Sequence, residues 1–161
     1  MSDDRFDITS ARDWLGRTLG TSGWVPLDQA TVDAYAALTG DRDWLHNDPE
    51  RARRDSPFGG RTIVQGSLLL AHCVPLLEQV APASDDGYAL NYGFERVRFV
   101  RPVPVGSRIR ATYVLRDVRE RPAPHGGTRQ VLVMEVVIEA DDAPGPAVVA
   151  QWLGLVHRPS S

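Results

Sequence analysis

Two side chains in the first third of the chain could carry acid–base chemistry. Asp41 and His46 lie five residues apart in the segment TGDRDWLHND, residues 39–48. An imidazole is the side chain best matched to proton transfer near neutral pH, and a neighbouring carboxylate can orient it and raise its basicity. The two groups could therefore converge on one water molecule. In the alternative interpretation, Asp41 and Asp43 cap a turn and His46 packs beside Trp44.

A second polar element is GGRTIVQGS, residues 59–67, which leads into a long apolar segment. Gly66 is expected at or just before the start of a helix, where backbone N–H groups lack partners and the helix dipole is positive. Such a site can stabilise an oxyanion, for example the enolate of a thioester. The alternative is an ordinary helix N-terminus, with Gly66 or Ser67 as the capping residue.

The segments around these residues have the signals of short helices. Asp28 is expected to cap a helix over residues 29–38, and Gly40 is suited to end it in the left-handed conformation. Asp48 is expected to cap a second helix over residues 49–54, whose first residue is a proline. The acid–base segment is therefore expected to form a loop between the two helices.

A longer helix is expected over residues 67–80. It is apolar on nearly every side, which is typical of a buried helix. Pro75 should kink this helix or begin its second half, because proline lacks the N–H that a helix interior needs. His72 and Cys73 lie next to each other on it and are expected in the core rather than as metal ligands. Adjacent helical positions point in different directions, so the two cannot easily share a metal.

From residue 88 onward, the apolar period changes from 3.6 to 2, which indicates strands. Four strands are expected, over residues 88–99, 108–116, 131–139 and 148–157. Segments rich in proline and glycine separate them, as in turns. Because the strands follow one another rather than alternating with helices, the fold class is expected to be α+β with an antiparallel sheet. One sheet wrapped around one buried helix fits these parts.

Length and composition limit the possible functions. A chain of 161 residues and 17.7 kDa fits a single domain over residues 1–161, with residues 1–23 as an N-terminal extension. The formal net charge of −3 and the lack of a basic run favour neither a nucleic-acid nor a membrane partner. No apolar stretch approaches the roughly 20 residues of a spanning helix.

The cysteine count and the N-terminus indicate a cytoplasmic protein. The single cysteine, Cys73, cannot form an internal disulfide, and the acidic N-terminal segment is unlike a signal peptide. No spacing of cysteines and histidines indicates a zinc site. No nucleophile-elbow, Walker or dinucleotide-binding motif is present in the sequence.

Together and in this order, the two polar elements resemble a known family. The text TGDRDWLHNDPERARRDSPFGGRTIVQG, residues 39–66, is similar to the hydratase motif of the MaoC-like dehydratases, which include the (R)-specific enoyl-CoA hydratases. The text NYGFERVRFVRPVPVGSRIRA, residues 91–111, resembles the same family. This segment resembles above all the nodulation-protein-N-like branch of the family. The letters WLH, where the family pattern has PLH, point to the same branch. The resemblance extends roughly from Trp24 to Val156.

The resemblance implies a hot-dog fold, in which an antiparallel sheet wraps around a long central helix. It implies that Asp41 and His46 hold the water that adds to, or leaves from, the β-carbon of an acyl thioester. Gly66 matches the glycine whose backbone N–H binds the thioester carbonyl, and Gln65 and Ser67 flank it. The implied partners are an acyl group on coenzyme A or an acyl carrier protein, and a second copy in a homodimer. No metal or redox cofactor is implied.

The sequence departs from the family pattern at three places. Asp43 stands where an asparagine is usual and adds a carboxylate beside the site, and Gln65 stands where a histidine is usual. Apolar residues occupy the part of the central helix where a serine or threonine often faces the site; they are Leu70, Ala71 and Val74.

Alternatives to a general hydratase or dehydratase therefore stay open. The departures at Asp43 and Gln65 leave room for a catalytically weakened subunit that acts as a binding or partner module. A tailoring dehydratase of a polyketide or other secondary-metabolite pathway would keep the same pair of catalytic residues. A hot-dog thioesterase would need a carboxylate on the central helix, where only Glu78, at its end, is available.

Overall fold

The computed structural model describes all residues except 1–5, 7, 82–86, 124–125 and 160–161. A 3₁₀ helix over Ile8–Trp14 comes first in the described chain. The α-helices are α1 Gln29–Thr39, α2 Trp44–Asn47, α3 Pro49–Asp55, α4 Gly66–Ala71 and α5 Cys73–Glu78. The strands are β1 Thr18–Thr21, β2 Val25–Pro26, β3 Tyr88–Phe99, β4 Arg108–Glu120, β5 Thr128–Ala140 and β6 Pro146–Arg158.

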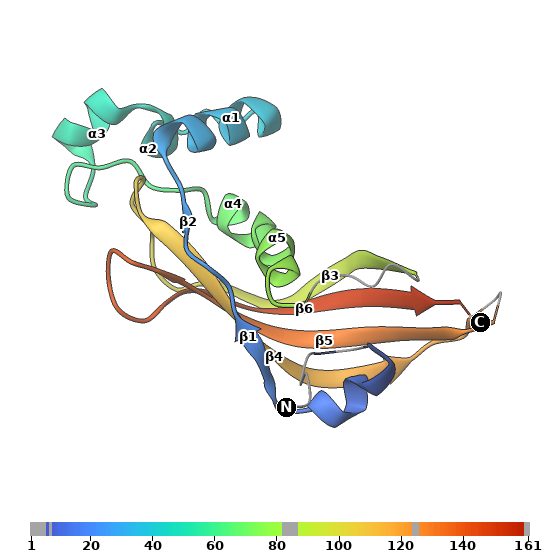
Figure 1. The fold of residues 1–161 in the computed structure, drawn as a ribbon. Coiled ribbons are helices and arrows are strands. Elements are labelled where there is room, and N and C mark those ends of the chain that lie inside the picture. Colours follow the sequence, from blue (N-terminus) through green and yellow to red (C-terminus); the bar gives the residue numbers. More distant parts are fainter. Residues whose placement is uncertain (1–5, 7, 82–86, 124–125, 160–161) are drawn as a thin grey trace.

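The strands form one antiparallel sheet in the order β1-β4-β5-β6-β3, and β2 also pairs with β4. Figure 1 shows this sheet curving beneath α4 and α5, while α1, α2 and α3 group beyond one end of it. Strand β3 pairs with β6 and lies at an edge of the sheet. The α+β class and the four long strands predicted from the sequence are confirmed.

The main core lies between the sheet and the central helix. Alternate residues of β4 are fully buried on this side, and they are Ile109, Ala111, Tyr113 and Leu115. They pack with the inward-facing side chains of the two central helical segments, which are Leu68, Leu69, Cys73, Leu76 and Leu77. The period of two in the strands therefore places every second side chain against the helix, as expected for a sheet with one covered face.

The central helix is broken as Pro75 predicted. α4 ends at Ala71 and α5 begins at Cys73, with His72 between them. Pro75 cannot donate a hydrogen bond to the carbonyl of Ala71, and its ring would contact that carbonyl in a continuous helix. The hydroxyl of Tyr113 donates to the carbonyl of Cys73 at 2.6 Å, which ties the break to the middle of the sheet.

The predicted burial of the central helix on nearly all sides is wrong for the single chain. Ser67, Ala71 and Pro75 are exposed, while Leu70 and Val74 are only partly buried. One sheet can cover only one side of a helix, so the apolar residues on its other side stay open to solvent.

Residues 1–23, expected as an N-terminal extension, contribute to the folded unit from Phe6 onward. Ala11 and Trp14 of the 3₁₀ helix belong to the main core, and β1 pairs with β4.

Candidate active site

The acid–base segment contains a helix that was not predicted. α1 ends at Gly40 in the left-handed conformation, with φ of 76°, as expected. The segment predicted as a loop then contains α2, a single helical turn. The carboxylate of Asp43 caps α2, because it accepts a hydrogen bond from the N–H of Leu45 at 2.9 Å. Asp48 caps α3 through the N–H of Arg51, which confirms that prediction. His46 therefore lies on a helical turn.

Asp41 and His46 face each other. Their nearest atoms, Oδ2 of Asp41 and Nε2 of His46, are 3.9 Å apart. This gap is too long for a direct hydrogen bond but allows one water molecule to contact both atoms. The side chain of His46 is 16% exposed and that of Asp41 is 36% exposed, so the pair is shielded but reachable.

The imidazole of His46 is held in one orientation. Its Nδ1 lies 2.7 Å from the carbonyl oxygen of Ile63, and because a carbonyl only accepts, Nδ1 carries the proton of this bond. In the neutral ring, Nε2 is then the acceptor, and it is the nitrogen that faces Asp41. The geometry thus presents a basic nitrogen and a carboxylate oxygen to the same small space.

Asp41 is held by the turn that follows it. Its Oδ1 accepts a hydrogen bond from the N–H of Asp43 at 3.1 Å, which leaves Oδ2 to face His46. The amide of Asn47 donates to the carbonyl oxygens of Asp41 and Asp43 at 3.3 and 3.2 Å, and so fixes the main chain on both sides. Asp43 therefore caps a helix, as in the simpler of the two interpretations of the sequence.

Gly66 is the first residue of α4, where it was predicted. Gln65 occupies the N-cap position but makes no side-chain capping bond, and Ser67 is exposed, so neither serves as a capping side chain. Gly66 lies three residues beyond Ile63, and the extended chain between them spans at most about 11 Å. The first turn of α4 therefore begins within about 11 Å of Ile63, whose carbonyl holds the imidazole of His46.

Gln65 points into the protein rather than toward solvent. Its side chain is 2% exposed, and its Nε2 donates to the carbonyl of Val32 in α1 at 3.3 Å. It thus connects the start of the central helix to α1. Its Oε1 is buried without a hydrogen-bond partner among the described residues.

The central-helix residues His72 and Cys73 belong to the structure of the helix, as predicted. Nδ1 of His72 lies 2.8 Å from the carbonyl of Leu68 in the preceding turn. Cys73 is 1% exposed, and this burial raises the pKa of its thiol to about 12, so the thiol is neutral near pH 7. Among the described residues, His, Cys, Asp and Glu form no group of three that could hold a metal ion.

Two amides that the sequence analysis did not single out contact the main chain of the site. Asn47 has the bonds described above, and Gln29 of α1 donates to the carbonyl of His46 at 2.7 Å. One sequence offers no signal for such amides, since an exposed asparagine or glutamine has the same local pattern.

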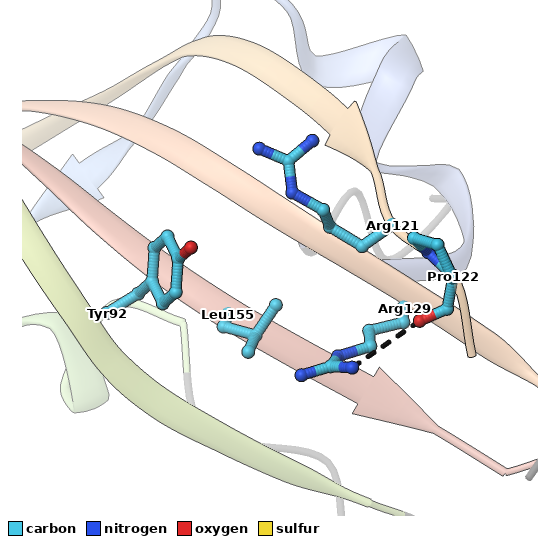
Figure 2. A pocket seen from close by; sticks show the side chains of 5 residues that line it. All are labelled: Tyr92, Arg121, Pro122, Arg129 and Leu155. Carbon is cyan, nitrogen blue, oxygen red and sulfur yellow. Dashed lines mark hydrogen bonds between the residues drawn. The ribbon is translucent and has the colours of Figure 1, made fainter. Parts of the chain in front are cut away.

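A shallow hollow of about 200 Å³ lies elsewhere. Figure 2 shows it between Tyr92 of β3, Leu155 of β6 and Arg129 of β5, and Arg121 and Pro122, which follow β4, complete its lining. Leu155 belongs to a separate apolar cluster, apart from the main core beneath α4 and α5. None of the predicted site residues lines this hollow, so it is a different place from the candidate site.

The fold and the site together define a MaoC-like protein. The family described as "MaoC like domain" matches residues 11–137, which is most of the chain. The chain therefore belongs to the MaoC-like family of hot-dog fold proteins. This confirms the family and the fold that the sequence motifs predicted.

Individual relatives extend over nearly the whole chain. Nodulation protein N of Rhizobium leguminosarum bv. viciae is 38% identical over 144 residues, which cover 89% of this chain and 86% of that protein. The 3-hydroxyacyl-thioester dehydratase Z of Mycobacterium tuberculosis (strain ATCC 25618 / H37Rv) is 41% identical over 136 residues, 84% of this chain and 86% of that protein. The (R)-hydratase from A. caviae has a similar structure, with a TM-score of 0.64, 26% identity, and coverage of 90% and 96%.

The described helices are too short or too polar to span a membrane.

Proposed function

We propose that the chain uses Asp41 and His46 to add water to a trans-2-enoyl thioester, and to remove water from the corresponding 3-hydroxyacyl thioester. The reaction class is that of the family, which includes a 3-hydroxyacyl-thioester dehydratase and an (R)-hydratase. The observation that supports the site is the 3.9 Å gap between Nε2 of His46 and Oδ2 of Asp41, with Nδ1 of His46 held by the carbonyl of Ile63.

In the hydration direction, the pair binds one water molecule in this gap. The pair takes a proton from the water while the water oxygen bonds to C3 of the enoyl group, and a proton passes from the pair to C2. Negative charge develops on the thioester oxygen as an enolate. The backbone N–H of Gly66, at the positive end of α4, stabilises that charge. Dehydration follows the same steps in reverse, and no proton is gained or lost overall.

The acyl group is carried on coenzyme A or on an acyl carrier protein, because both present the same thioester. In this proposal Ser67 is exposed beside Gly66 at the entrance of the site. A tailoring dehydratase of a polyketide or other secondary-metabolite pathway would use the same two residues on a different acyl chain. The single cysteine suits a reducing compartment, and we place the reaction in the cytoplasm.

Two features of the chain argue against the other functions considered from the sequence. The departures at Asp43 and Gln65 left room for a weakened subunit, but both side chains have structural partners. Asp43 caps α2, and Gln65 contacts α1. The thioesterase alternative needs a carboxylate poised on the central helix. Glu78 is the acidic residue of α4 and α5, and it is exposed at the end of α5.

The test is absorbance at the enoyl-thioester band with crotonyl-CoA, longer enoyl-CoA thioesters and carrier-bound enoyl groups. The wild type should consume at least one of them. Asp41→Asn and His46→Gln should each lower turnover by roughly 10² or more, because each removes one member of the acid–base pair. Circular dichroism should show both variants folded. Turnover close to that of the wild type in either folded variant would contradict the assignment.

A further inference from the structure

Gln29 joins three parts of the chain around the catalytic histidine. It lies in the first turn of α1, next to the capping residue Asp28. Its Nε2 donates to the carbonyl oxygen of His46 at 2.7 Å and to Oδ1 of Asp33 at 2.8 Å. Its Oε1 accepts a hydrogen bond from the hydroxyl of Thr62 at 2.6 Å. Both the NH₂ group and the oxygen of the side-chain amide are therefore hydrogen-bonded.

The orientation of this amide follows from its partners. The carbonyl of His46 and the carboxylate of Asp33 can only accept, so both require the NH₂ end of Gln29. The hydroxyl of Thr62 can donate to the remaining oxygen. A flipped amide would place its oxygen against two acceptors. A carboxylate at position 29 would do the same, although it has nearly the same shape.

The partners of Gln29 include the main chain of His46 and the residue just before the one that holds its ring. Thr62 directly precedes Ile63, whose carbonyl accepts the hydrogen bond of Nδ1 at 2.7 Å. The N–H of Ile63 in turn donates to the carbonyl of Leu45 at 3.0 Å. Gln29 therefore connects the main chain of His46 with the segment Thr62–Ile63, whose carbonyl at Ile63 orients the ring. Thr62 is 5% exposed, so water cannot easily replace its bond to Gln29.

We propose that Gln29 is a positioning residue that fixes His46 relative to Ile63 and Asp41. This inference rests on the proposed function of the Asp41 and His46 pair. α2 has only four residues, and a helix of one turn has no stability of its own, so its place depends on contacts such as this one. A displacement of about 1 Å at a reacting group can lower a rate about a hundredfold.

Two substitutions of Gln29 separate its hydrogen bonds from its bulk. Gln29→Met keeps the length of the side chain and removes all three bonds. Gln29→Glu keeps the acceptor for Thr62 but places an oxygen against the carbonyl of His46 and the carboxylate of Asp33. We expect kcat to fall at least about tenfold in Gln29→Met and further in Gln29→Glu, with KM changed less than about threefold.

Two further variants guard against a simple loss of folding. Thr62→Val is close in shape to the wild type and removes only the bond to Oε1, so its kcat should fall less than that of Gln29→Met. Gln79→Met is the matched control, because the Oε1 of Gln79 accepts a bond from the N–H of Gly23 at 3.0 Å, in a different part of the chain. It removes a glutamine hydrogen bond far from His46, so its kcat should stay that of the wild type.

The direct readout is the nitrogen NMR spectrum of the imidazole rings, with His46→Gln used to assign the His46 signals. The wild type and Gln79→Met should show the tautomer with the proton on Nδ1. Gln29→Met should show mixed or exchange-broadened His46 signals. Unchanged His46 signals and kcat in Gln29→Met would overturn the proposal, as would equal effects in Gln79→Met. If the wild type turns over no thioester, the proposed function fails, and the spectrum still decides whether Gln29 orients His46.

Discussion

At Gly66 the backbone, rather than a side chain, carries the proposed chemistry. A Cβ atom built on this residue would lie 3.0 Å from the ring of Phe99, tighter than ordinary van der Waals contact. Phe99 lies at the end of β3 and is 53% exposed, so its ring can move aside. A methyl group at this position should therefore cost the fold little, and under the proposed function it would act mainly on the N–H that faces the substrate carbonyl.

We expect Gly66→Ala to lower turnover by about tenfold or more, because the methyl group and the displaced Phe99 crowd the N–H that binds the oxyanion. The free energy of unfolding should fall by less than about 1 kcal/mol. Steady-state kinetics and urea denaturation measure the two effects. Gly23→Ala is the control, since its added Cβ would meet only Gln79 at an ordinary distance of 3.4 Å. A Gly66→Ala enzyme as fast as the wild type would refute this role.

At the same scale, the sequence predicted the pairing of Asp41 with His46 and the position of Gly66, because types and spacing carry those signals. For Asp43 it left two interpretations open, an extra carboxylate at the site and a capping residue, and the structure shows the cap of α2. The sequence did not indicate Gln29. The roles of these two residues depend on which main-chain groups lie within reach in three dimensions.

Among the elements, the broken central helix is tied to the sheet by a buried hydroxyl. Tyr113 of β4 is fully buried, and its OH donates to the carbonyl of Cys73 at the first residue of α5. Burial raises the pKa of this phenol, so the hydroxyl keeps its proton throughout the working pH range. Ionisation of the phenol therefore does not break this bond near neutral pH.

Tyr113→Phe should destabilise the fold by about 1 kcal/mol, because it removes a buried hydrogen bond between the sheet and the central helix. Urea denaturation followed by circular dichroism measures the change. Tyr92→Phe provides the comparison, since Tyr92 is 56% exposed on the edge strand and should lose almost nothing. Equal stabilities of the two variants would show that the Tyr113 hydroxyl does not anchor the helix.

The sequence predicted the long elements better than the short ones. The caps at Asp28 and Asp48, the break caused by Pro75 and all four long strands follow from local patterns. α2 and β1 were not predicted, and each has only four residues. Segments of that length carry little periodic signal, and their conformation is set by tertiary contacts such as the pairing of β1 with β4.

For the whole molecule, the main open surface is the edge of the sheet at β3. Large apolar side chains are exposed along and just after this strand, and they are Tyr88, Leu90, Tyr92, Phe99 and Val100. The solvent-facing side of the central helix is apolar as well. An exposed edge with apolar side chains favours pairing with another strand, so a second copy of this chain is the proposed partner.

Static light scattering should give a mass of about twice 17.7 kDa. Leu90→Arg places a charge on the edge strand and should shift the protein toward the monomer. Leu38→Arg introduces the same charge at a residue of α1 that is 84% exposed, and should stay dimeric. A monomeric and fully active wild type would contradict the dimer, and a dimeric Leu90→Arg would place the interface away from β3.

The pairing of β3 with β6 has a consequence for the order in which the chain folds during synthesis. β3 precedes β4 and β5 in sequence, but its partner in the sheet begins only at Pro146. While a ribosome makes the intervening residues, β3 must wait with its backbone groups and apolar side chains unpaired. Such segments are prone to aggregate, and long-range strand pairing is slow. A nascent chain halted before β6 should therefore be the species that most needs a chaperone, although α1 to α5 have already been made.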